Sequence, residues 1–362
     1  SLVGQNPEDI LNLFDMAGSM WVGYFHSEIL SVDSHIFIYR LIDFIGYLIV
    51  GIIVYLLLSK IKKINSQTAL IISLLTITFP VNLTRVSIIN IPSGFCLALF
   101  FIASYMMIYS SQKKLFGLDI IAVLLFFISF ELNSLLVYYI IPIVYLFFLK
   151  KDAWLKADII DTLAGVLKYI FANIHFILLP IFYFWIKSSY FKPYGVYEKY
   201  NSFNVNLKTF YSLPDAFMNS FYYQLYDLKI YINEISLMIA LVMFFVVLKY
   251  KIQKNSLYFI LLILGFFIFF IGVLPYYVVG KTDVSEWQDR FQILVPLGAA
   301  IVLYSVVMLF LREKIGILVL SMVIGLSIYN NNIVLGAFLI DGIKQDAIML
   351  SLGTMPQVKK AT

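Results

Sequence analysis

Cysteine and histidine are scarce in this sequence of 362 residues. Cys96 is the only cysteine, which excludes an internal disulfide and a multi-thiolate metal site. The three histidines, His26, His35 and His175, are too scattered along the sequence to suggest a metal centre. No metal site is therefore predicted, although the carboxylates described below leave a divalent cation open as a cofactor.

Charged residues are also few, at 13% of the chain against roughly 25% in soluble domains. The formal net charge of +5 does not indicate nucleic-acid binding, because the lysines stand in short clusters between apolar runs. Four catalytic motifs are missing as well: GxxxxGK[ST], GxGxxG, HExxH and GxSxG. Their absence argues against ATPases, oxidoreductases, zinc proteases and serine hydrolases of the common types.

Apolar residues are abundant instead. They make up 62% of the sequence, the mean hydropathy is +0.91, and runs of about 18 or more apolar residues recur along the chain. These runs do not alternate as barrel strands do, and only helices otherwise pair every backbone group in hydrocarbon. We predict an all-α, polytopic membrane protein with about ten spans in a single transmembrane domain, residues 1–362. The predicted spans are roughly 36–59, 68–82, 92–110, 117–130, 133–149, 168–187, 233–249, 256–278, 291–311 and 315–331.

Basic loops indicate the orientation. Lysine or arginine follows every second predicted span, beginning with the first, and the positive-inside rule places these loops in the cytoplasm. The segments that then face outward are 1–35, 83–91, 188–232, 279–290 and 332–362. Because an outward N-terminal segment of this length usually follows an earlier span, we expect about eleven spans in the full protein.

Three carboxylates in the first outer segment are candidates for a catalytic base. Glu8 and Asp9 follow Asn6 and Pro7 in a pattern typical of a helix start, where acids offset the helix dipole, and Asp15 lies one to two turns further on. A carboxylate near a low-dielectric surface can have a raised pKa, which suits a base that deprotonates an acceptor hydroxyl. Either role, stabilising the helix start or acting as a catalytic base, is possible for these three carboxylates.

A fourth carboxylate, Glu131, interrupts the apolar stretch 117–149, which is too long for one helical span and short for two. We predict a helical hairpin with Glu131 at its polar tip, and an ionisable group at membrane depth is a functional candidate by default. Arg40 and Asp43 lie three residues apart on one helix face, where they could pair locally or serve function.

Three outer cations run against the positive-inside trend: Arg85, Lys281 and Arg290. A guanidinium grips phosphate through two hydrogen bonds, so these residues are candidates for binding the phosphate of a substrate or lipid headgroup. The alternative for Arg290 is an ion pair with a neighbouring acid. Trp287 is either an interfacial anchor or part of the same binding site.

Tyrosine, phenylalanine and asparagine are concentrated in the outer segment 188–232. This composition is typical of half-helices that lie at the membrane interface. It also suits a sugar site, where aromatic faces pack on pyranose C–H groups while amides and carboxylates bind the hydroxyls. The sequence leaves both interpretations open.

Three features together resemble the GT-C superfold of membrane glycosyltransferases, in particular the bacterial members that use polyprenyl-phosphate sugars. They are the acidic pair Glu8-Asp9, the sequence SFELN at 129–133, and the stretch LPYYVVG…W..RF at 274–291. The sequence departs from that group in having no Asp-x-Asp pair and no large soluble domain at its C-terminal end.

The resemblance implies a site and a setting. Asp9, or else Glu8 or Asp15, would be the base, and Arg85 and Arg290 would hold the lipid phosphate. A sugar would pass with inversion from a polyprenyl-phosphate carrier to an acceptor on the outer face of the bacterial cell membrane. The partners would be a polyprenyl-linked sugar or glycan and the membrane lipids.

Two other functions fit the sequence. A polymerase of O-antigen or exopolysaccharide repeat units would share the span count, the arginine-bearing outer loops and the undecaprenyl-linked substrate. A transporter or flippase of a lipid-linked or anionic solute would need a polar pathway to the cytoplasmic side, whereas the charges here gather outside. Neither the sugar nor the oligomeric state follows from the sequence.

Overall fold

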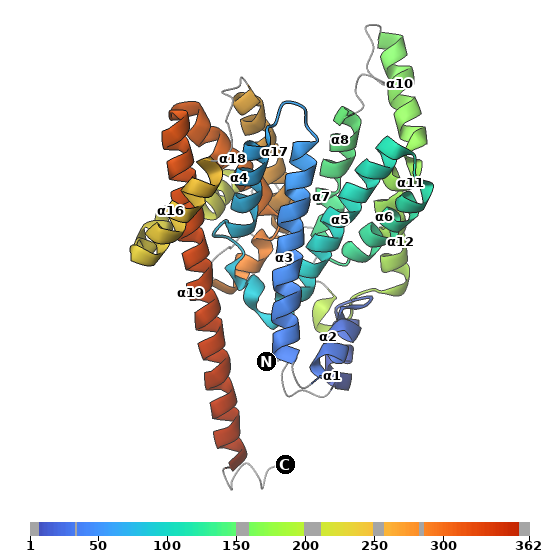
Figure 1. The fold of residues 1–362 in the computed structure, drawn as a ribbon. Coiled ribbons are helices and arrows are strands. Elements are labelled where there is room, and N and C mark those ends of the chain that lie inside the picture. Colours follow the sequence, from blue (N-terminus) through green and yellow to red (C-terminus); the bar gives the residue numbers. More distant parts are fainter. Residues whose placement is uncertain are drawn as a thin grey trace.

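The computed structural model describes residues 7–32, 35–149, 159–198, 211–248, 257–281 and 286–354, and all regular secondary structure in these ranges is helical. The predicted all-α fold is confirmed for this part of the chain (Figure 1). Its first half forms α1 (Pro7–Met16), α2 (Val22–Leu30), α3 (His35–Ser59), α4 (Ser66–Thr78), η1 (Leu83–Val86), η2 (Ile88–Asn90), α5 (Ile91–Lys113), α6 (Phe116–Ser129), α7 (Ser134–Tyr138) and α8 (Ile140–Leu149). The rest forms α10 (Ile159–Ala172), α11 (Ile174–Ile177), α12 (Leu179–Tyr190), η3 (Gly195–Tyr197), α14 (Leu213–Phe217), η4 (Met218–Tyr222), α15 (Tyr223–Asp227), η5 (Leu228–Tyr231), α16 (Glu234–Leu248), α17 (Leu257–Val278), η6 (Glu286–Gln292), α18 (Val295–Phe310) and α19 (Glu313–Thr354).

Four helices of the described chain are long and apolar enough to cross a membrane: α3, η2 with α5, α17, and α19 as far as Lys344. The number rises to six if two bent pairs, α10 with α11–α12 and α14–η5 with α16, each count as one span. The prediction of about ten spans is not confirmed, because several predicted spans are shorter helices, namely α4, α6, α7–α8 and α18. The 13 residues of α4, for example, extend about 20 Å, against about 30 Å of hydrocarbon.

Glycines bring α17 and α18 into close contact at the centre of the bundle. A Cβ atom at Gly298 would lie 2.3 Å from Phe269 N, and one at Gly272 would lie 2.6 Å from Leu294 O. Small residues let helix backbones approach this closely, and close packing holds membrane helices together where lipid tails are as apolar as the side chains. These two helices therefore pack as one unit.

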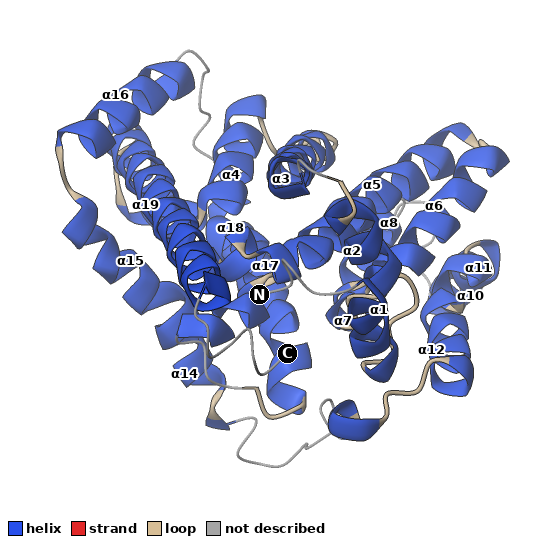
Figure 2. Ribbon diagram, turned by 90° about the horizontal axis from the view of Figure 1, so that it is seen from below, coloured by secondary structure: helices blue, strands red, loops and turns tan. Residues whose placement is uncertain are grey.

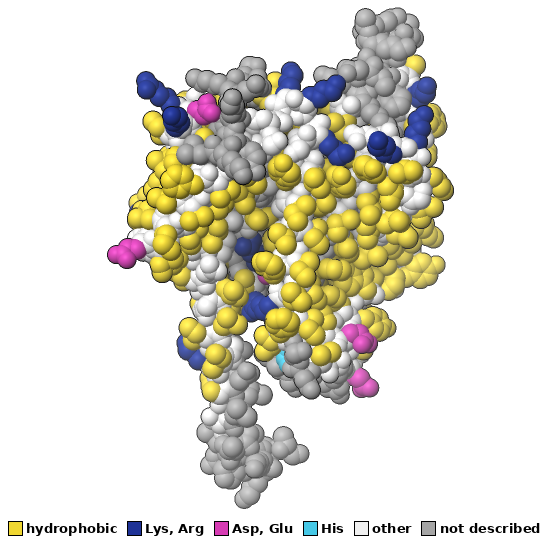
Figure 3. Space-filling view, viewed as in Figure 1, with side chains coloured by type: hydrophobic (Ala, Val, Ile, Leu, Met, Phe, Trp, Pro, Cys, Tyr) yellow, Lys and Arg dark blue, Asp and Glu magenta, His cyan; other side chains and the backbone are white. Residues whose placement is uncertain are grey.

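Polar contacts at one end of the bundle join the loops predicted to face the cytoplasm. Lys60, after α3, donates to Gln112 near the end of α5 at 3.1 Å. Gln67, at the start of α4, donates to Val247 O near the end of α16 at 2.7 Å. Figure 3 shows lysine and arginine side chains along this edge, above a broad apolar band. Loops expected on one side of the membrane thus lie together, and we call the opposite end the outer end.

α19 is much longer than the span predicted at 315–331. It is one helix of 42 residues, about 63 Å long, and Figure 1 shows it projecting beyond the outer end of the bundle. The outer tail predicted at 332–362 is therefore helical as far as Thr354. The helix continues because it contains no proline, and Gly336 and Gly342 within it cost only about 1 kcal/mol each.

Figure 2 views the molecule from the outer end. α1 and α2 cover the side formed by α5, α6 and α7, whereas α14 and α15 form a rim on the side of α17. The helix that runs from α14 to η5 meets α16 at an angle of 115°. At the outer end, α1 and α2 thus cover one half of the bundle, and α14 and α15 border the other half. The candidate site residues are divided between these two halves.

Candidate functional site

Glu131 lies in the turn between α6 and α7, at the tip of the predicted hairpin. Its Oε1 lies 3.4 Å from Lys187 Nζ of α12, and its Oε2 accepts a hydrogen bond from Tyr183 OH at 3.3 Å. The Lys187 and Glu131 side chains are only 14% and 7% exposed. A charge pair shielded in this way loses much of its stability if either partner is removed, so it fastens α12 to the α6–α7 turn.

The same carboxylate anchors the first outer segment. Its Oε1 accepts a hydrogen bond from Met20 N at 3.3 Å, and the neighbouring Trp21 Nε1 donates to Ile128 O at 3.3 Å. Met20 and Trp21 lie between α1 and α2, so both contacts attach this connection to the end of α6. Glu131 therefore positions the segment that carries the other candidate bases.

Gly18, just before this attachment, contacts the chain that follows α12. Its φ is +70°, in the left-handed region, and a Cβ atom there would lie 2.5 Å from Phe191 O. Beyond it, Tyr194 N donates to Met16 O at 3.0 Å, and Tyr194 OH donates to Asp15 Oδ2 at 2.8 Å. The close approach and the positive φ together require glycine at this position.

The predicted bases Glu8, Asp9 and Asp15 all belong to α1. Glu8 and Asp9 occupy its first turn, as the helix-start pattern predicted, and all three side chains are exposed. α1 packs against α2 and η3. The structure thus joins Asp15, through Tyr194 and the α1–α2 connection, to the Glu131 cluster. The role of each carboxylate as a base stays a prediction.

Asp289 in η6 holds the irregular chain at the start of η1. Its Oδ1 accepts a hydrogen bond from Asn82 N at 2.7 Å, and its Oδ2 accepts the N–H groups of Leu83 and Thr84. α4 has already ended here, so these backbone groups have no helical partner beside an apolar bundle. Burial raises the pKa of Asp289 to about 6, although the three N–H groups and Arg85 favour its charged form.

Arg85 of η1 packs toward α3. Its Cζ lies 4.5 Å from the centre of the Tyr47 ring, and its guanidinium donates to Ile77 O at 3.2 Å. Arg40 of α3 donates to a backbone carbonyl of η1, while the buried Asp43 Oδ1 has no hydrogen-bond partner among the described residues. Arg85 and Asp43 thus belong to a cluster between α3 and η1, to which Asp289 adds a second carboxylate.

Lys281 and Arg290 meet at the ring of Phe291. Lys281 Nζ and Arg290 Cζ each lie 4.9 Å from the ring centroid. Burial, together with the positive charge of Arg290, lowers the pKa of Lys281 to about 8. Both cations thus lie at one aromatic ring, near enough for the charge of Arg290 to affect the pKa of Lys281. The structure therefore brings together two of the three cations proposed from the sequence.

Phe291 connects this cation pair to the Glu131 cluster. Its ring centroid lies 5.4 Å from that of Tyr276 on α17, and Tyr276 OH lies 2.9 Å from Ser134 Oγ. Ser134 opens α7, three residues after Glu131. Phe291, Tyr276 and Ser134 thus link the cation pair to the α6–α7 turn that holds Glu131.

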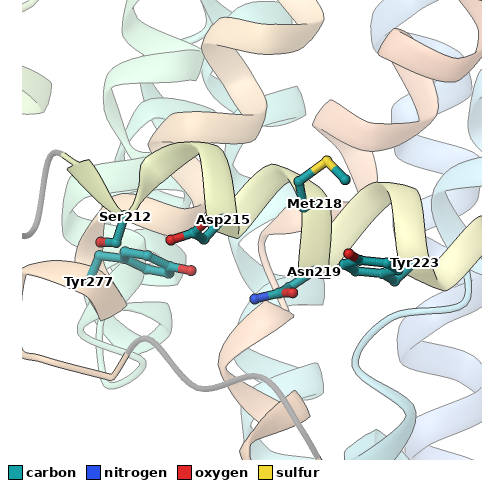
Figure 4. Close-up of a pocket in the computed structure, with 6 residues that line it drawn as sticks. All are labelled: Ser212, Asp215, Met218, Asn219, Tyr223 and Tyr277. Carbon is teal, nitrogen blue, oxygen red and sulfur yellow. The ribbon is translucent and has the colours of Figure 1, made fainter.

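A cavity of about 360 Å³ lies beside the outer end of α17. Figure 4 shows its lining, which comes from the segment α14–α15 and from α17. The residues that line it are Ser212, Asp215, Met218, Asn219, Tyr223 and Tyr277. Five of them belong to the aromatic outer segment 188–232, whose residues at the cavity form short helices.

Two features proposed from the sequence, Trp287 and a divalent cation, are only partly covered by the described residues. The backbone of Trp287 belongs to η6, and its side chain lies outside the described structure. Within the described ranges, no group of three or more His, Cys, Asp or Glu side chains could hold a metal ion. The divalent cation that the sequence left open stays a prediction.

Sequence reasoning missed Lys187, Tyr183 and Phe291. Tyr183 and Lys187 are four residues apart, which puts them on one helix face, and this spacing was the available signal for a partner of Glu131. Phe291 ends the stretch quoted at 274–291, but nothing in the sequence indicated that its ring contacts both cations.

No protein-family model, no curated protein sequence and no solved structure matches this chain. The described chain is all-helical and has four to six helices long and apolar enough to cross a membrane, so the fold places it in the class of helical membrane proteins. Any function beyond that class has to be argued from the outer surface itself.

Proposed function

We propose that this protein is a membrane-embedded glycosyltransferase that moves a sugar from a polyprenyl-phosphate carrier to a glycan or lipid acceptor at the outer end of the bundle. The observation that carries the proposal is the cation pair Lys281 and Arg290 on the ring of Phe291. Through Phe291, Tyr276 and Ser134 this pair is connected to the turn that holds Glu131, and Glu131 in turn attaches the segment that carries the other three candidate carboxylates.

The cation pair suits a phosphate monoester or diester at a membrane surface. The guanidinium of Arg290 offers paired N–H donors that match phosphate oxygens, and the ammonium of Lys281 adds a compact charge. Stacking on Phe291 limits the freedom of both side chains, which reduces the entropy that binding costs. The polyprenyl tail would extend into the surrounding lipid, where exposed apolar side chains cover the helices.

The reaction balances with these groups alone. A carboxylate of α1, Asp9 or else Glu8 or Asp15, takes the proton of an acceptor hydroxyl, and the oxygen attacks the anomeric carbon. The new C–O bond forms as the bond from the anomeric carbon to the phosphate oxygen breaks. The electron pair leaves with polyprenyl phosphate, whose growing negative charge the cation pair stabilises. Attack opposite the leaving group inverts the anomeric carbon.

Glu131 has a positioning role in this scheme. Both of its oxygens already have partners, in Met20 N, Lys187 and Tyr183 OH. Acting as a base would require it to give up these contacts. Through Met20 it instead fixes the α1–α2 connection, and with it the carboxylates of α1, relative to the helix bundle.

The test follows donor consumption by the protein in lipid nanodiscs, with a mixture of polyprenyl-phosphate sugars and mass spectrometry of the remaining donor. We expect consumption by the unaltered protein and loss of consumption in Arg290→Ala. Arg312→Ala removes an exposed arginine near the opposite end and should have no effect. Among Glu8→Gln, Asp9→Asn and Asp15→Asn, one variant should lose turnover while still binding donor, and that variant identifies the base.

Other outcomes would point to the other functions. If no lipid-linked monosaccharide is consumed and a lipid-linked oligosaccharide is lengthened instead, the protein is a polymerase. If neither substrate changes chemically and a lipid-linked saccharide crosses the bilayer of proteoliposomes, the protein is a transporter. Equal donor loss in Arg290→Ala and Arg312→Ala would remove the role assigned to the cation pair.

A further inference from the structure

The cavity beside α17 has a polar lining in an otherwise apolar protein. Asp215, Asn219 and Tyr223 come from one short helical stretch, and Tyr277 at the end of α17 lies beside Ser212 and Asp215 (Figure 4). Five of the six lining residues carry a hydroxyl, an amide or a carboxylate. Its volume of about 360 Å³ lies within the range of roughly 300–1,000 Å³ typical of small-molecule sites.

The sequence of this stretch is spaced to build such a lining. Ser212, Asp215, Asn219 and Tyr223 follow one another at intervals of three, four and four residues, which puts them on one face of a helix. The opposite face is buried, with Ala216 fully covered by the bundle. The stretch is therefore amphipathic, and the cavity receives its polar face.

A π-helical turn, η4, occupies the middle of the stretch at Met218–Tyr222. π-Helical turns are rare and occur frequently at functional sites, because the extra residue re-aims the side chains around it. Here the turn contains Asn219 and directly precedes Tyr223, two of the cavity residues. Phe221 of this turn stacks on Phe217 of α14, with ring centroids 4.8 Å apart, and Phe217 contacts Phe269 of α17, which holds the apolar side of the stretch against that helix.

The chemistry of the lining matches a sugar. Tyrosine faces pack on the C–H groups of a pyranose, and a carboxylate with a primary amide can accept from and donate to neighbouring ring hydroxyls. A phosphate would instead be repelled by Asp215, and a lipid tail would leave the carboxylate and the amide without partners. These residues thus favour a neutral polar ligand with several hydroxyl groups.

We propose that this cavity binds a neutral saccharide, with Asp215 and Asn219 bonded to its hydroxyls and Tyr223 packed on its ring. Saccharide binding at this cavity does not depend on the proposed function. The identification of the saccharide as the acceptor glycan of the transferase does rest on it. The cavity is on the segment α14–α15, apart from the residues assigned above to the donor phosphate.

Binding is measured without any donor, by saturation-transfer NMR on the protein in lipid nanodiscs. The probes are the methyl glycosides of glucose, galactose and N-acetylglucosamine. Asp215→Asn and Tyr223→Ala should each weaken binding of the best probe by about tenfold or more, because each loses a principal contact to the saccharide. The matched controls Asp227→Asn and Tyr226→Ala alter exposed neighbours outside the cavity and should bind as the unaltered protein does.

Thermal unfolding, followed with a thiol-reactive dye at Cys96, confirms that each variant is folded. The inference is overturned if no glycoside gives saturation transfer, or if folded cavity variants bind like their controls, even when the protein consumes donor. Binding that is lost only in the cavity variants supports the inference, even if no donor is consumed and the transferase proposal fails.

Discussion

Replacing Gly18 with alanine tests whether docking of the first outer segment positions the catalytic base. Gly18 has φ +70°, and its added Cβ would lie 2.5 Å from Phe191 O and 3.0 Å from Pro193 N. Both neighbours are backbone atoms, so no rotamer change relieves the overlap. The α1–α2 connection must therefore move away from the chain that follows α12.

The magnitude follows from what the movement breaks. The left-handed conformation costs an alanine about 1–2 kcal/mol. Four hydrogen bonds attach α1 and the connection to the rest of the protein: Met20 N to Glu131, Trp21 Nε1 to Ile128 O, Tyr194 N to Met16 O, and Tyr194 OH to Asp15. At about 0.5–1.5 kcal/mol each, they contribute roughly 2–6 kcal/mol. The variant should thus lose roughly 3–8 kcal/mol of docking free energy, enough to release α1 and α2 locally without unfolding the bundle.

Hydrogen exchange measures this release in nanodiscs. Peptides within residues 7–32 should exchange about 100-fold faster in Gly18→Ala, since 3 kcal/mol is about two powers of ten in an opening equilibrium. Donor binding should persist while turnover falls, because Lys281 and Arg290 lie on another segment. Gly336→Ala is the matched control, as a Cβ there meets nothing within 4 Å. Unchanged protection of residues 7–32 in Gly18→Ala would refute the docking argument.

Three further predictions use donor binding and the dye assay at Cys96. Glu131→Gln should lower the unfolding temperature, because the Lys187 ammonium loses its counter-charge in a shielded site, and adding Lys187→Met should recover part of the loss. Donor affinity should fall as the pH rises through about 8, where Lys281 gives up its proton, and Lys281→Arg should keep its affinity at higher pH; equal profiles would exclude Lys281 from the site. Gly298→Ala should destabilise the protein by about 3 kcal/mol or more, because its Cβ would lie 2.3 Å from Phe269 N; an unchanged unfolding temperature would contradict the close contact of α17 and α18.

The all-helical fold followed from the sequence because its cause is local. Long apolar runs without alternation leave helices as the way to pair the backbone in hydrocarbon. The turn at Glu131 was also predictable, because a carboxylate inside a 33-residue apolar stretch (117–149) has to mark a break. The basic clusters in the loops after α3 and α5 indicated correctly that these two ends lie together.

The number of spans could not be read in the same way. Hydropathy does not separate side chains that face lipid from side chains that face other helices. α4 is a case in point: Ile71, Ile72 and Leu75 are at most 1% exposed, so they are apolar because the protein covers them. The apolar run continues past α4 through Phe79, although the helix has ended and Asp289 pairs the backbone a few residues further on. A short buried helix and a full span thus have the same sequence signature.

The candidate site was harder to predict because it is assembled across the chain. Asp289 is separated from Asn82 by 207 residues, and Tyr276 from Ser134 by 142. Charge alone pointed to Lys281 and Arg290, since an outer cation is unusual, but the ring that brings them together is an ordinary phenylalanine. A charged residue on an unusual side of the membrane could be proposed from the sequence. A residue whose importance lies in its contacts in the folded protein could not.

The donor site, the acceptor site and the base of the proposed reaction lie on different segments of the chain. The donor phosphate would bind at Lys281 and Arg290, which follow α17, and the acceptor saccharide beside Tyr277, which ends it. The base would come from α1, which the α1–α2 connection attaches to α6 through Glu131. Since α7 and α17 are joined by Ser134 and Tyr276, displacement of either helix would change the distance between base and donor. Catalysis therefore requires that these contacts hold while a large lipid enters and leaves, which a docked, hydrogen-bonded segment allows and a loose one does not.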